Sequence, residues 1–379
     1  MRNLFALAAL TLAHAAVAGP LTPPPGPPTS TLRTLDQVEP RTEINTLPGI
    51  LGTLHAIDQP GSYYLTGDIV TIPPIIIRIT ASNAVIDLNG FALDGNGTAP
   101  TAIRVAIPAG VVTVRNGTIR NTTGLAIQLD NPFSTRVILD NVVVTDCGSG
   151  GSATRCTIIN SGGGLGPAIK GESDTVVRDT TIDGVEGIAL GNRALVERVR
   201  VFGVTTAGIT VGDDALVADA VVVGADLVGI EAGDRSIVRG SRVRSITGDG
   251  IRMGDGARVL NSIVAQVTAE GFELGDAARV EGCRADDCAV RGFQIGNQSI
   301  MSTSTATNND FDGILTGSAS VVDQCIAQFN GTNGIRVGSN TIVIKSIATQ
   351  NDRDGIEGST NVLVALSSAS ANGLNGITL

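Results

Sequence analysis

The residues best suited to bind a cation are acidic side chains that recur every 21 positions in the second half of the chain. This acidic column reads Asn192, Asp213, Asp234, Asp255, Asp276 and Asn297. If successive repeats stack, its carboxylates lie about 5 Å apart and repel one another unless water or a cation screens them. Oxygen ligands of this kind suit Ca²⁺, so the four aspartates are a candidate calcium site. Gly-Asp pairs are also good turn chemistry, in which each Asp forms a hydrogen bond within its own corner. The continuation of the column favours that interpretation: Ser318, Ser339 and Thr360.

Arginines are the candidate bases for the elimination reaction of a polysaccharide lyase on an acidic glycan. That reaction needs a cation held by carboxylates and an Arg or Lys base near the acidic sugar. Lysine occurs only at Lys170 and Lys345, so the base would be an arginine. The candidates are Arg104, Arg115, Arg120 and Arg178. Histidine occurs only at His14 and His55, which removes His-dependent catalysis and a His-rich transition-metal site from the repeats.

Exposed aromatic side chains serve as stacking platforms for sugars, and the less regular N-terminal part contains Tyr63, Tyr64, Phe91 and Phe133. Loops that interrupt a solenoid are where binding residues collect. The candidate ligand-binding residues are therefore Tyr63, Tyr64, Arg104, Arg115 and Arg120. Phe272 and Phe293 belong to an apolar column of the repeat and are predicted to lie in the core.

A second charged column, Glu231, Arg252 and Glu273, alternates in sign with the same spacing. Side chains one repeat apart on a parallel sheet can pair, for roughly 0.2 to 1 kcal/mol each. The column therefore predicts a structural surface, although a groove that binds acidic sugars would look similar.

Two columns of glycine, which we call the glycine ladders, indicate the fold that positions the candidate side chains. The first is followed by Ile or Phe and recurs every 21 residues, and the second lies four residues further on. The first ladder contains Gly187, Gly208, Gly229, Gly250, Gly271, Gly292, Gly313, Gly334, Gly355 and Gly376. Between glycines the apolar residues alternate with period two, as in short strands that bury one face. Valines such as Val217 and Val238 also share a column.

These columns predict an all-β fold, a right-handed parallel β-helix with about 21 residues per coil. A leucine-rich repeat would need Leu at fixed positions, and helical repeats would lose roughly 1 kcal/mol at each Gly. One coil cannot bury its own apolar face, so stability must come from stacking. With 48 Gly and 3% aromatic residues, the composition suits strands and tight corners better than a round core.

A further column of the repeat is polar and reads Cys288, Asn309, Asn330, Asn351 and Asn372. Stacked Asn side chains can hydrogen-bond from coil to coil, which predicts a structural asparagine ladder. Cys283 and Cys325 lie in a small-residue column two coils apart, too far for a disulfide, and are predicted to be buried thiols. The pairing of Cys147 with Cys156 stays open.

The chain is predicted to have three regions. Residues 1–18 are predicted to be a signal peptide, with a positive start, a short apolar stretch and a small-residue cleavage site. Residues 19–34 are a Pro-rich linker. Residues 35–379 are the β-helix, with an N-terminal cap at 35–84, irregular coils at 85–186 and regular coils at 187–379. The export signal predicts a secreted, cell-surface or periplasmic protein.

Residues 57–70, 85–95 and 112–120, together with the Gly-Ile/Phe coils, resemble a family of uncharacterised exported bacterial right-handed β-helix proteins. This family belongs to the pectin-lyase-like superfamily. The resemblance implies the fold for nearly the whole mature chain. It leaves the activity open, because this superfamily includes lyases, hydrolases, epimerases, glycan-binding modules and adhesins. The polygalacturonase Gly-His-Gly and Arg-Ile-Lys motifs and the Asp-Pro-His motif of alginate epimerases do not occur in this sequence.

The leading hypothesis is a non-catalytic extracellular β-helix that binds a polysaccharide or serves as a cell-surface scaffold. The alternatives are a polysaccharide lyase or related enzyme on an acidic glycan, and a self-associating adhesin-like rod that joins end to end through an uncapped C-terminal coil. The net charge of −10 argues against nucleic acid and against an anionic membrane surface, and no segment outside the signal is long and apolar enough to span a membrane. No cofactor is firmly implied, and Ca²⁺ is the one candidate.

Overall fold

The computed structural model describes residues 41–107, 110–123, 125–129, 135–145, 152–153, 157–159, 167–171, 173, 176–183 and 186–379. The chain divides into two units, Met1–Pro40 and Arg41–Leu379, and the description below concerns the second unit. The predicted signal peptide, the Pro-rich linker, Cys147 and Cys156 lie outside the described residues.

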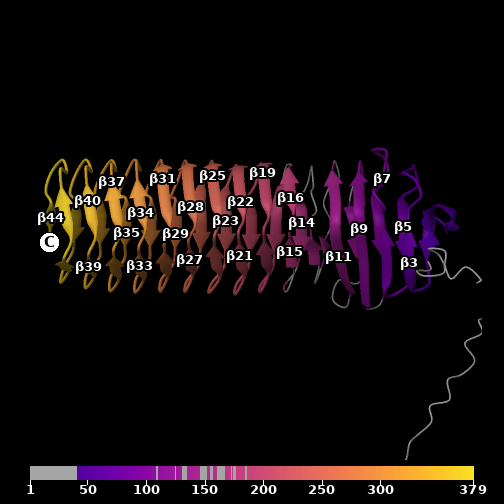
Figure 1. Cartoon of the computed structure of the whole chain (residues 1–379), viewed down its shortest axis with the longest axis horizontal. Helices are drawn as coiled ribbons and strands as arrows, with labels where there is room; N and C mark the ends of the chain where they lie inside the picture. Colours follow the sequence, from indigo (N-terminus) through magenta and orange to yellow (C-terminus); the bar gives the residue numbers. More distant parts are fainter. Residues whose placement is uncertain are drawn as a thin grey trace, which may run out of the picture. The chain divides into compact units, whose positions relative to one another are not determined.

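The second unit is a stack of coils in which short strands form three parallel sheets, A, B and C (Figure 1). Sheet A contains β1 (Thr42–Glu43), β3 (Gly61–Tyr64), β4 (Ile69–Val70), β6 (Ala84–Asp87), β7 (Ala92–Asp94), β9 (Gly110–Arg120), β11 (Thr135–Thr145), β13 (Thr157–Ile159), β15 (Val176–Arg178), β18 (Leu195–Glu197), β21 (Leu216–Ala218), β24 (Ile237–Arg239), β27 (Arg258–Leu260), β30 (Arg279–Glu281), β33 (Ile300–Ser302), β36 (Val321–Asp323), β39 (Ile342–Ile344) and β42 (Leu363–Ala365).

Sheet B contains β2 (Thr53–Ile57), β5 (Ile75–Ile79), β8 (Thr101–Val105), β10 (Leu125–Leu129), β12 (Ser152–Ala153), β14 (Pro167–Gly171), β17 (Glu186–Leu190), β20 (Ile209–Val211), β23 (Val228–Ala232), β26 (Asp249–Met253), β29 (Phe272–Leu274), β32 (Phe293–Ile295), β35 (Ile314–Thr316), β38 (Ile335–Val337), β41 (Ile356–Gly358) and β44 (Ile377–Thr378). Sheet C contains β16 (Thr181–Asp183), β19 (Arg200–Val204), β22 (Val221–Ala225), β25 (Arg242–Ile246), β28 (Ile263–Val267), β31 (Arg284–Cys288), β34 (Thr305–Thr307), β37 (Ile326–Gln328), β40 (Ile347–Thr349) and β43 (Ser368–Ser370). The one helical element in the described part is η1 (Ile44–Thr46), a short 3-10 turn.

The register of the strands confirms the predicted columns. Each strand pairs in parallel with its equivalent one coil later, and Val217 of β21 lies directly beside Val238 of β24. The parallel β-helix inferred from the 21-residue spacing is therefore the observed fold.

Both glycine ladders mark places where no side chain fits. A Cβ on Gly250 would lie 2.5 Å from the backbone oxygen of Gly271 and 2.2 Å from a methyl group of Val264. A Cβ on Gly233 would lie 2.2 Å from the carboxylate of Asp213. The first ladder thus allows close backbone stacking, and the second leaves room for the acidic column.

Single residues in the left-handed region turn the chain at its corners, at three positions of each regular coil. One such column, between sheets A and C, contains Asp219, Gly240, Asn261, Gly282, Thr303, Gln324, Lys345 and Leu366. Glycine and asparagine adopt positive φ at little cost, whereas a β-branched residue such as Thr303, at φ 48°, is strained there.

The inward columns form one continuous core. Phe272 and Phe293 are fully buried, as predicted, and their rings stack with centroids 4.6 Å apart. The asparagine ladder is also confirmed, with Asn330 Nδ2 donating to Asn351 Oδ1 at 2.8 Å. Its amide oxygens also accept buried backbone N–H groups, as when Asn309 N–H donates to Asn330 Oδ1 at 3.2 Å.

The cysteines of the regular coils are buried and free, as predicted, and they behave as small core residues. Burial raises the pKa of the Cys283 thiol to about 11 and that of Cys325 to about 12. Thiols with such values are not activated nucleophiles at neutral pH.

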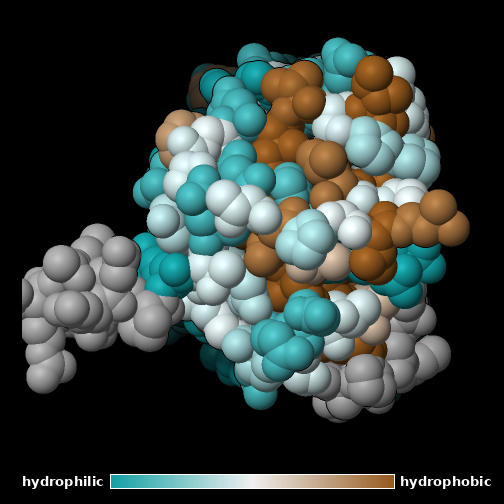
Figure 2. Space-filling view, turned by 90° about the vertical axis from the view of Figure 1, so that its right-hand side faces the viewer, coloured by the Kyte–Doolittle hydropathy of each residue, from teal (hydrophilic) through white to brown (hydrophobic). Residues whose placement is uncertain are grey.

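Apolar side chains gather on the N-terminal end of the second unit, which Figure 2 views end-on. Exposed apolar residues of the first coils are Ile50, Leu51, Val70 and Ile72. Among the residues described, no helix has the length and apolar character needed to cross a bilayer.

Candidate functional site

The most concentrated group of interacting charges in the described residues lies on the outer side of sheet B. We call it the sheet B band, and it consists of Glu231, Asp249, Arg252, Glu270, Glu273, Arg291, Gln294, Asp312 and Arg336. The strand pattern explains its placement: the residue after each first-ladder glycine points inward, as Ile251 and Phe272 do, and the next residue points outward. The remaining members directly precede such a glycine.

Ion pairs and hydrogen bonds join the band across successive coils. Arg252 contacts Glu231 at 2.7 Å and Asp249 at 3.4 Å. Further along, Arg291 contacts Glu270 at 3.2 Å and donates to Gln294 Oε1 at 2.7 Å.

The band continues towards the C-terminus through Asp312. This carboxylate is 2.8 Å from Arg336 and 3.8 Å from Arg291. Gln294 Nε2 in turn donates to Glu273 at 3.4 Å within its own row, while the contact of Gln294 with Arg291 joins the two rows of the band.

Three carboxyl groups meet at the centre of the band: Asp249, Glu270 and Glu273. Burial raises the pKa of Glu270 and of Glu273, and the charge of Asp249 raises both further. A hydrogen bond with Asp249 favours the protonated form of each glutamic acid. The two glutamic acids therefore release their protons at a higher pH than an isolated glutamic acid does.

The aromatic and basic residues that the sequence predicts to bind a ligand lie on two different sheets, A and B. Tyr64 lies on sheet A in register with Asp87, which lies in register with Arg115. The ring of Tyr63 is buried in the core, and its hydroxyl donates to the Gln59 carbonyl at 2.6 Å. Arg104 lies apart from them on sheet B.

Most of the predicted basic residues are engaged in ion pairs. Arg115 is 3.0 Å from Asp87, Arg120 is 2.8 Å from Asp94, and Arg178 is 3.0 Å from Glu197. Asp87 and Asp94 also accept backbone N–H groups two residues ahead, so each is part of a turn.

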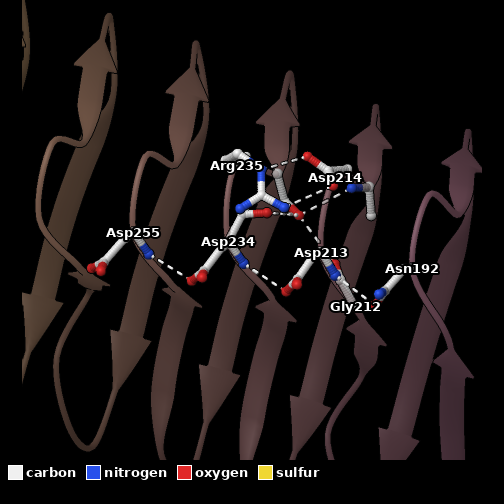
Figure 3. Close-up of polar contacts among 9 residues, drawn as sticks. Asn192, Gly212, Asp213, Asp214, Asp234, Arg235 and Asp255 are labelled. Carbon is white, nitrogen blue, oxygen red and sulfur yellow. Dashed lines mark hydrogen bonds and ion pairs between the residues drawn. The ribbon is translucent and has the colours of Figure 1, made fainter.

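The acidic column forms a ladder of hydrogen bonds, shown in Figure 3. Each side-chain oxygen accepts the backbone N–H of the next coil: Asp234 N–H donates to Asp213 Oδ1 at 3.0 Å, and Asp255 N–H donates to Asp234 Oδ1 at 2.9 Å. Each carboxylate thus serves the corner of the next coil, whereas the turn interpretation placed this bond within its own corner. Beside the ladder, Arg235 forms two hydrogen bonds with Asp214, at 2.8 and 2.9 Å.

The calcium site that the sequence predicts at the acidic column stays a prediction. Within the described ranges, no three His, Cys, Asp or Glu side chains are grouped so that they could hold a metal ion.

Sequence reasoning identified Glu231, Arg252 and Glu273 but not Gln294 and Arg336 of the same row, and it missed the whole of the other row of the band. The residues of that other row precede the first-ladder glycines: Asp249, Glu270, Arg291 and Asp312. The signal was present, because this column turns from apolar at Val228 to polar or charged at every coil from Asp249 onward.

Residues 227–376 match the family described as Right handed beta helix region. This segment extends from β23 to β43, and the match confirms the right-handed β-helix that the resemblance implied. No curated protein is detectably similar in sequence.

Three solved structures are similar to this chain at low identity. The Azotobacter vinelandii mannuronan C-5 epimerase AlgE6 A-module is 11% identical, with a TM-score of 0.38 and 88% of each chain covered. The periplasmic alginate epimerase AlgG is 13% identical, with a TM-score of 0.39, 89% of this chain and 83% of its own. The catalytic domain of a GH87 alpha-1,3-glucanase is 9% identical, with a TM-score of 0.31, 86% of this chain and 61% of its own. At such identities the likeness concerns the fold alone.

Proposed function

We propose that the protein binds an extracellular polysaccharide along the sheet B band, and that the preferred glycan is neutral. The observation that carries this proposal is the row of carboxyl, guanidinium and amide groups that runs from Glu231 to Arg336 across successive coils. Hydroxyl groups of a sugar can both donate to carboxylates and accept from guanidinium groups. A linear array of such groups suits a linear polymer.

The charge of the band supports a neutral rather than an anionic ligand. Five of its members are acidic and three are basic, so negative charge is in excess even where a proton is shared. An anionic glycan would meet unfavourable potential along most of this face. The acidic glycan of the lyase alternative is therefore less well supported at this site.

Binding can be tested by calorimetry with soluble neutral β- and α-glucans, and with alginate and pectate for comparison. We expect heat with at least one neutral polymer. The variant Glu273→Gln should weaken binding about tenfold, since a hydrogen bond to a charged group contributes about 1.5 kcal/mol.

The matched control is Glu281→Gln, which changes a partly exposed glutamate of sheet A in the next strand of the same coil. Equal losses in both variants, or binding of alginate and pectate alone, would contradict the proposal.

Cleavage of the bound glycan is the second candidate function, favoured by the raised pKa values of Glu270 and Glu273. The acid and the base of glycoside hydrolysis are two carboxyl groups that flank the glycosidic bond, and these are the roles proposed for Glu270 and Glu273. The test is the release of reducing ends from neutral glycans. Activity that Glu270→Gln and Glu273→Gln both retain would exclude these residues as its source.

Export by residues 1–18 completes the proposed function, because an extracellular ligand requires it. Fusing residues 1–34 to a reporter enzyme should carry the reporter across the bacterial inner membrane. A fusion that lacks residues 1–18 is the control.

A further inference from the structure

A second charged feature lies away from the sheet B band, at the corner between sheets A and C. Here a hollow of about 440 Å³ lies over strands β16, β19, β22 and β25, which Figure 1 shows as neighbours in the stack. The residues that matter are Arg198, Arg200, Asp219, Val221 and Arg242.

The register explains why the hollow forms. Arg200, Val221 and Arg242 follow one another in a single outward column of sheet C. Coils are about 4.8 Å apart, so the two arginines flank Val221 at a separation of about 10 Å. The short side chain of Val221 leaves a space between two long ones.

The arginines of the hollow differ in whether they have a partner. Arg198 forms two hydrogen bonds with Asp179, at 2.6 and 2.8 Å, and a third contact with Glu197 at 3.0 Å. Arg200 and Arg242 are exposed, and neither guanidinium group has a hydrogen bond or ion pair with any residue that the structure describes.

The difference in partners indicates different roles for these arginines. Arg198 is already neutralised and fixes the corner. Arg200 and Arg242 each offer a fork of N–H donors that matches the geometry of an oxyanion.

Asp219 adds a different property to the same hollow. It occupies the left-handed corner position, and its carboxylate has no side-chain partner among the described residues. One free carboxylate beside two free guanidinium groups leaves a net positive site that can still accept hydrogen bonds. A ligand with an anionic group and neighbouring hydroxyls satisfies both.

We propose that this hollow is a binding site for an anionic sugar, whose carboxylate, sulfate or phosphate group is held between Arg200 and Arg242 while its hydroxyls donate to Asp219. The site is independent of the sheet B band, because its residues come from sheet C and the corner between sheets A and C. It gives the molecule one surface for a neutral glycan and another for an anionic group.

Titration calorimetry at low salt tests the site with four probes: glucuronate, glucose 1-phosphate, inorganic phosphate and glucose. We expect heat with the two anionic sugars, weaker binding of inorganic phosphate and none of glucose. Because the contacts are exposed, added salt should weaken the binding.

Variants then locate the site. Arg200→Gln and Arg242→Gln should each weaken anionic sugar binding about tenfold, as expected for the loss of one charge-assisted hydrogen-bonding pair. Arg258→Gln is the matched control, since Arg258 is also an exposed arginine without a partner in the described part but lies on sheet A. Thermal unfolding should be little changed in all three, because none of these guanidinium groups has a hydrogen bond or ion pair with a described residue.

Three results would overturn the proposal: no heat with either anionic sugar, an equal loss in Arg258→Gln, or full binding in the Arg200→Gln/Arg242→Gln double variant. Asp219→Asn tests the hydroxyl contact separately. It should reduce the preference for glucuronate and glucose 1-phosphate over inorganic phosphate, and an unchanged preference would remove Asp219 from the site. Loss of neutral glycan binding through Glu273→Gln would leave these results unaffected.

Discussion

Asn330 lies directly over Asn351, and the two side chains share a buried hydrogen bond of 2.8 Å between Nδ2 and Oδ1. The side-chain oxygen of Asn330 in turn accepts the buried backbone N–H of Asn309, at 3.2 Å. Each rung of the ladder therefore satisfies both a side chain and a corner of the backbone.

Asn330→Ala should lower the free energy of unfolding by about 1 to 3 kcal/mol, because it leaves a buried N–H donor without a partner. Urea denaturation followed by circular dichroism measures the change. Gln328→Ala removes a partly exposed amide two residues away and should shift the midpoint little. Equal shifts would show that the buried hydrogen bonds do not matter.

The stacked phenylalanines give a prediction about packing. Phe293→Ala should cost about 3 to 5 kcal/mol, because it opens a cavity beside Phe272 in a fully buried column. Phe311→Ala is the control, since Phe311 is 48% exposed. A thermal midpoint that falls equally in both variants would argue against the inward placement of Phe293.

Backbone strain at a corner predicts a stabilising substitution. Thr303 is exposed and has φ 48°, while Gly240 and Gly282 hold the equivalent corner of other coils. Thr303→Gly should raise the free energy of unfolding by about 1 kcal/mol, since it removes the left-handed penalty of a side chain. Thr305→Gly, in an extended strand, should do the opposite, and a loss of stability in both would contradict the strain argument.

The carboxyl cluster predicts how stability depends on pH. Burial and the charge of Asp249 raise the pKa of Glu270 and Glu273 above the ordinary value of 4.5. Over the window between 4.5 and the raised values, the folded state binds more protons than the unfolded state. Stability should therefore fall as the pH rises through that window.

Glu273→Gln should flatten this slope, because it removes one of the two titrating groups and the repulsion from Asp249. Urea midpoints between pH 4 and pH 8 report the difference, with Arg252 and Arg291 left in place. Glu281→Gln tests whether the loss of a partly exposed carboxylate outside the band has the same effect. A slope unchanged by Glu273→Gln would count against a shared proton in the band.

Variants of the acidic column can distinguish the contribution of hydrogen bonding to stability from that of charge. Asp234→Asn keeps an oxygen for the N–H of Asp255 and removes one of several stacked charges, so stability should be equal or slightly higher. Asp234→Ala should lose about 0.5 to 1.5 kcal/mol with that bond. Calcium titration of the same variants tests the predicted metal site: heat in the wild type that Asp234→Asn abolishes would support it, and no heat would leave turn chemistry as the role.

The columns of the regular coils could be predicted from sequence because identical side chains stack on one another. Val217 and Val238, the asparagine ladder and the buried cysteines follow directly from a 21-residue spacing. In the earlier coils the spacing varies, since Asp87 pairs in register with Arg115, 28 residues later, and the strand positions there could not be counted.

The partners of charged side chains could not be predicted. Arg198 and Arg200 are two residues apart and of the same type, yet Arg198 turns at a corner towards Asp179 and Arg200 stays free. The spacing places a residue on a face, but the corner geometry and the neighbouring coil decide what it contacts. For the same reason the meeting of Asp249, Glu270 and Glu273 became visible only in three dimensions.

Because the spacing of the glycine ladders is constant, a whole coil can be removed or added without changing the register of the others. Deletion of residues 251–271 would join Gly250 to Phe272 and restore the motif, with every ladder still in step. A gene that encodes such coils can gain or lose whole units by recombination between its own repeats. Each event would change the distance between a site on one coil and a site on another by a multiple of about 4.8 Å. The number of coils encoded in the gene therefore sets the distance between two bound ligands in discrete steps.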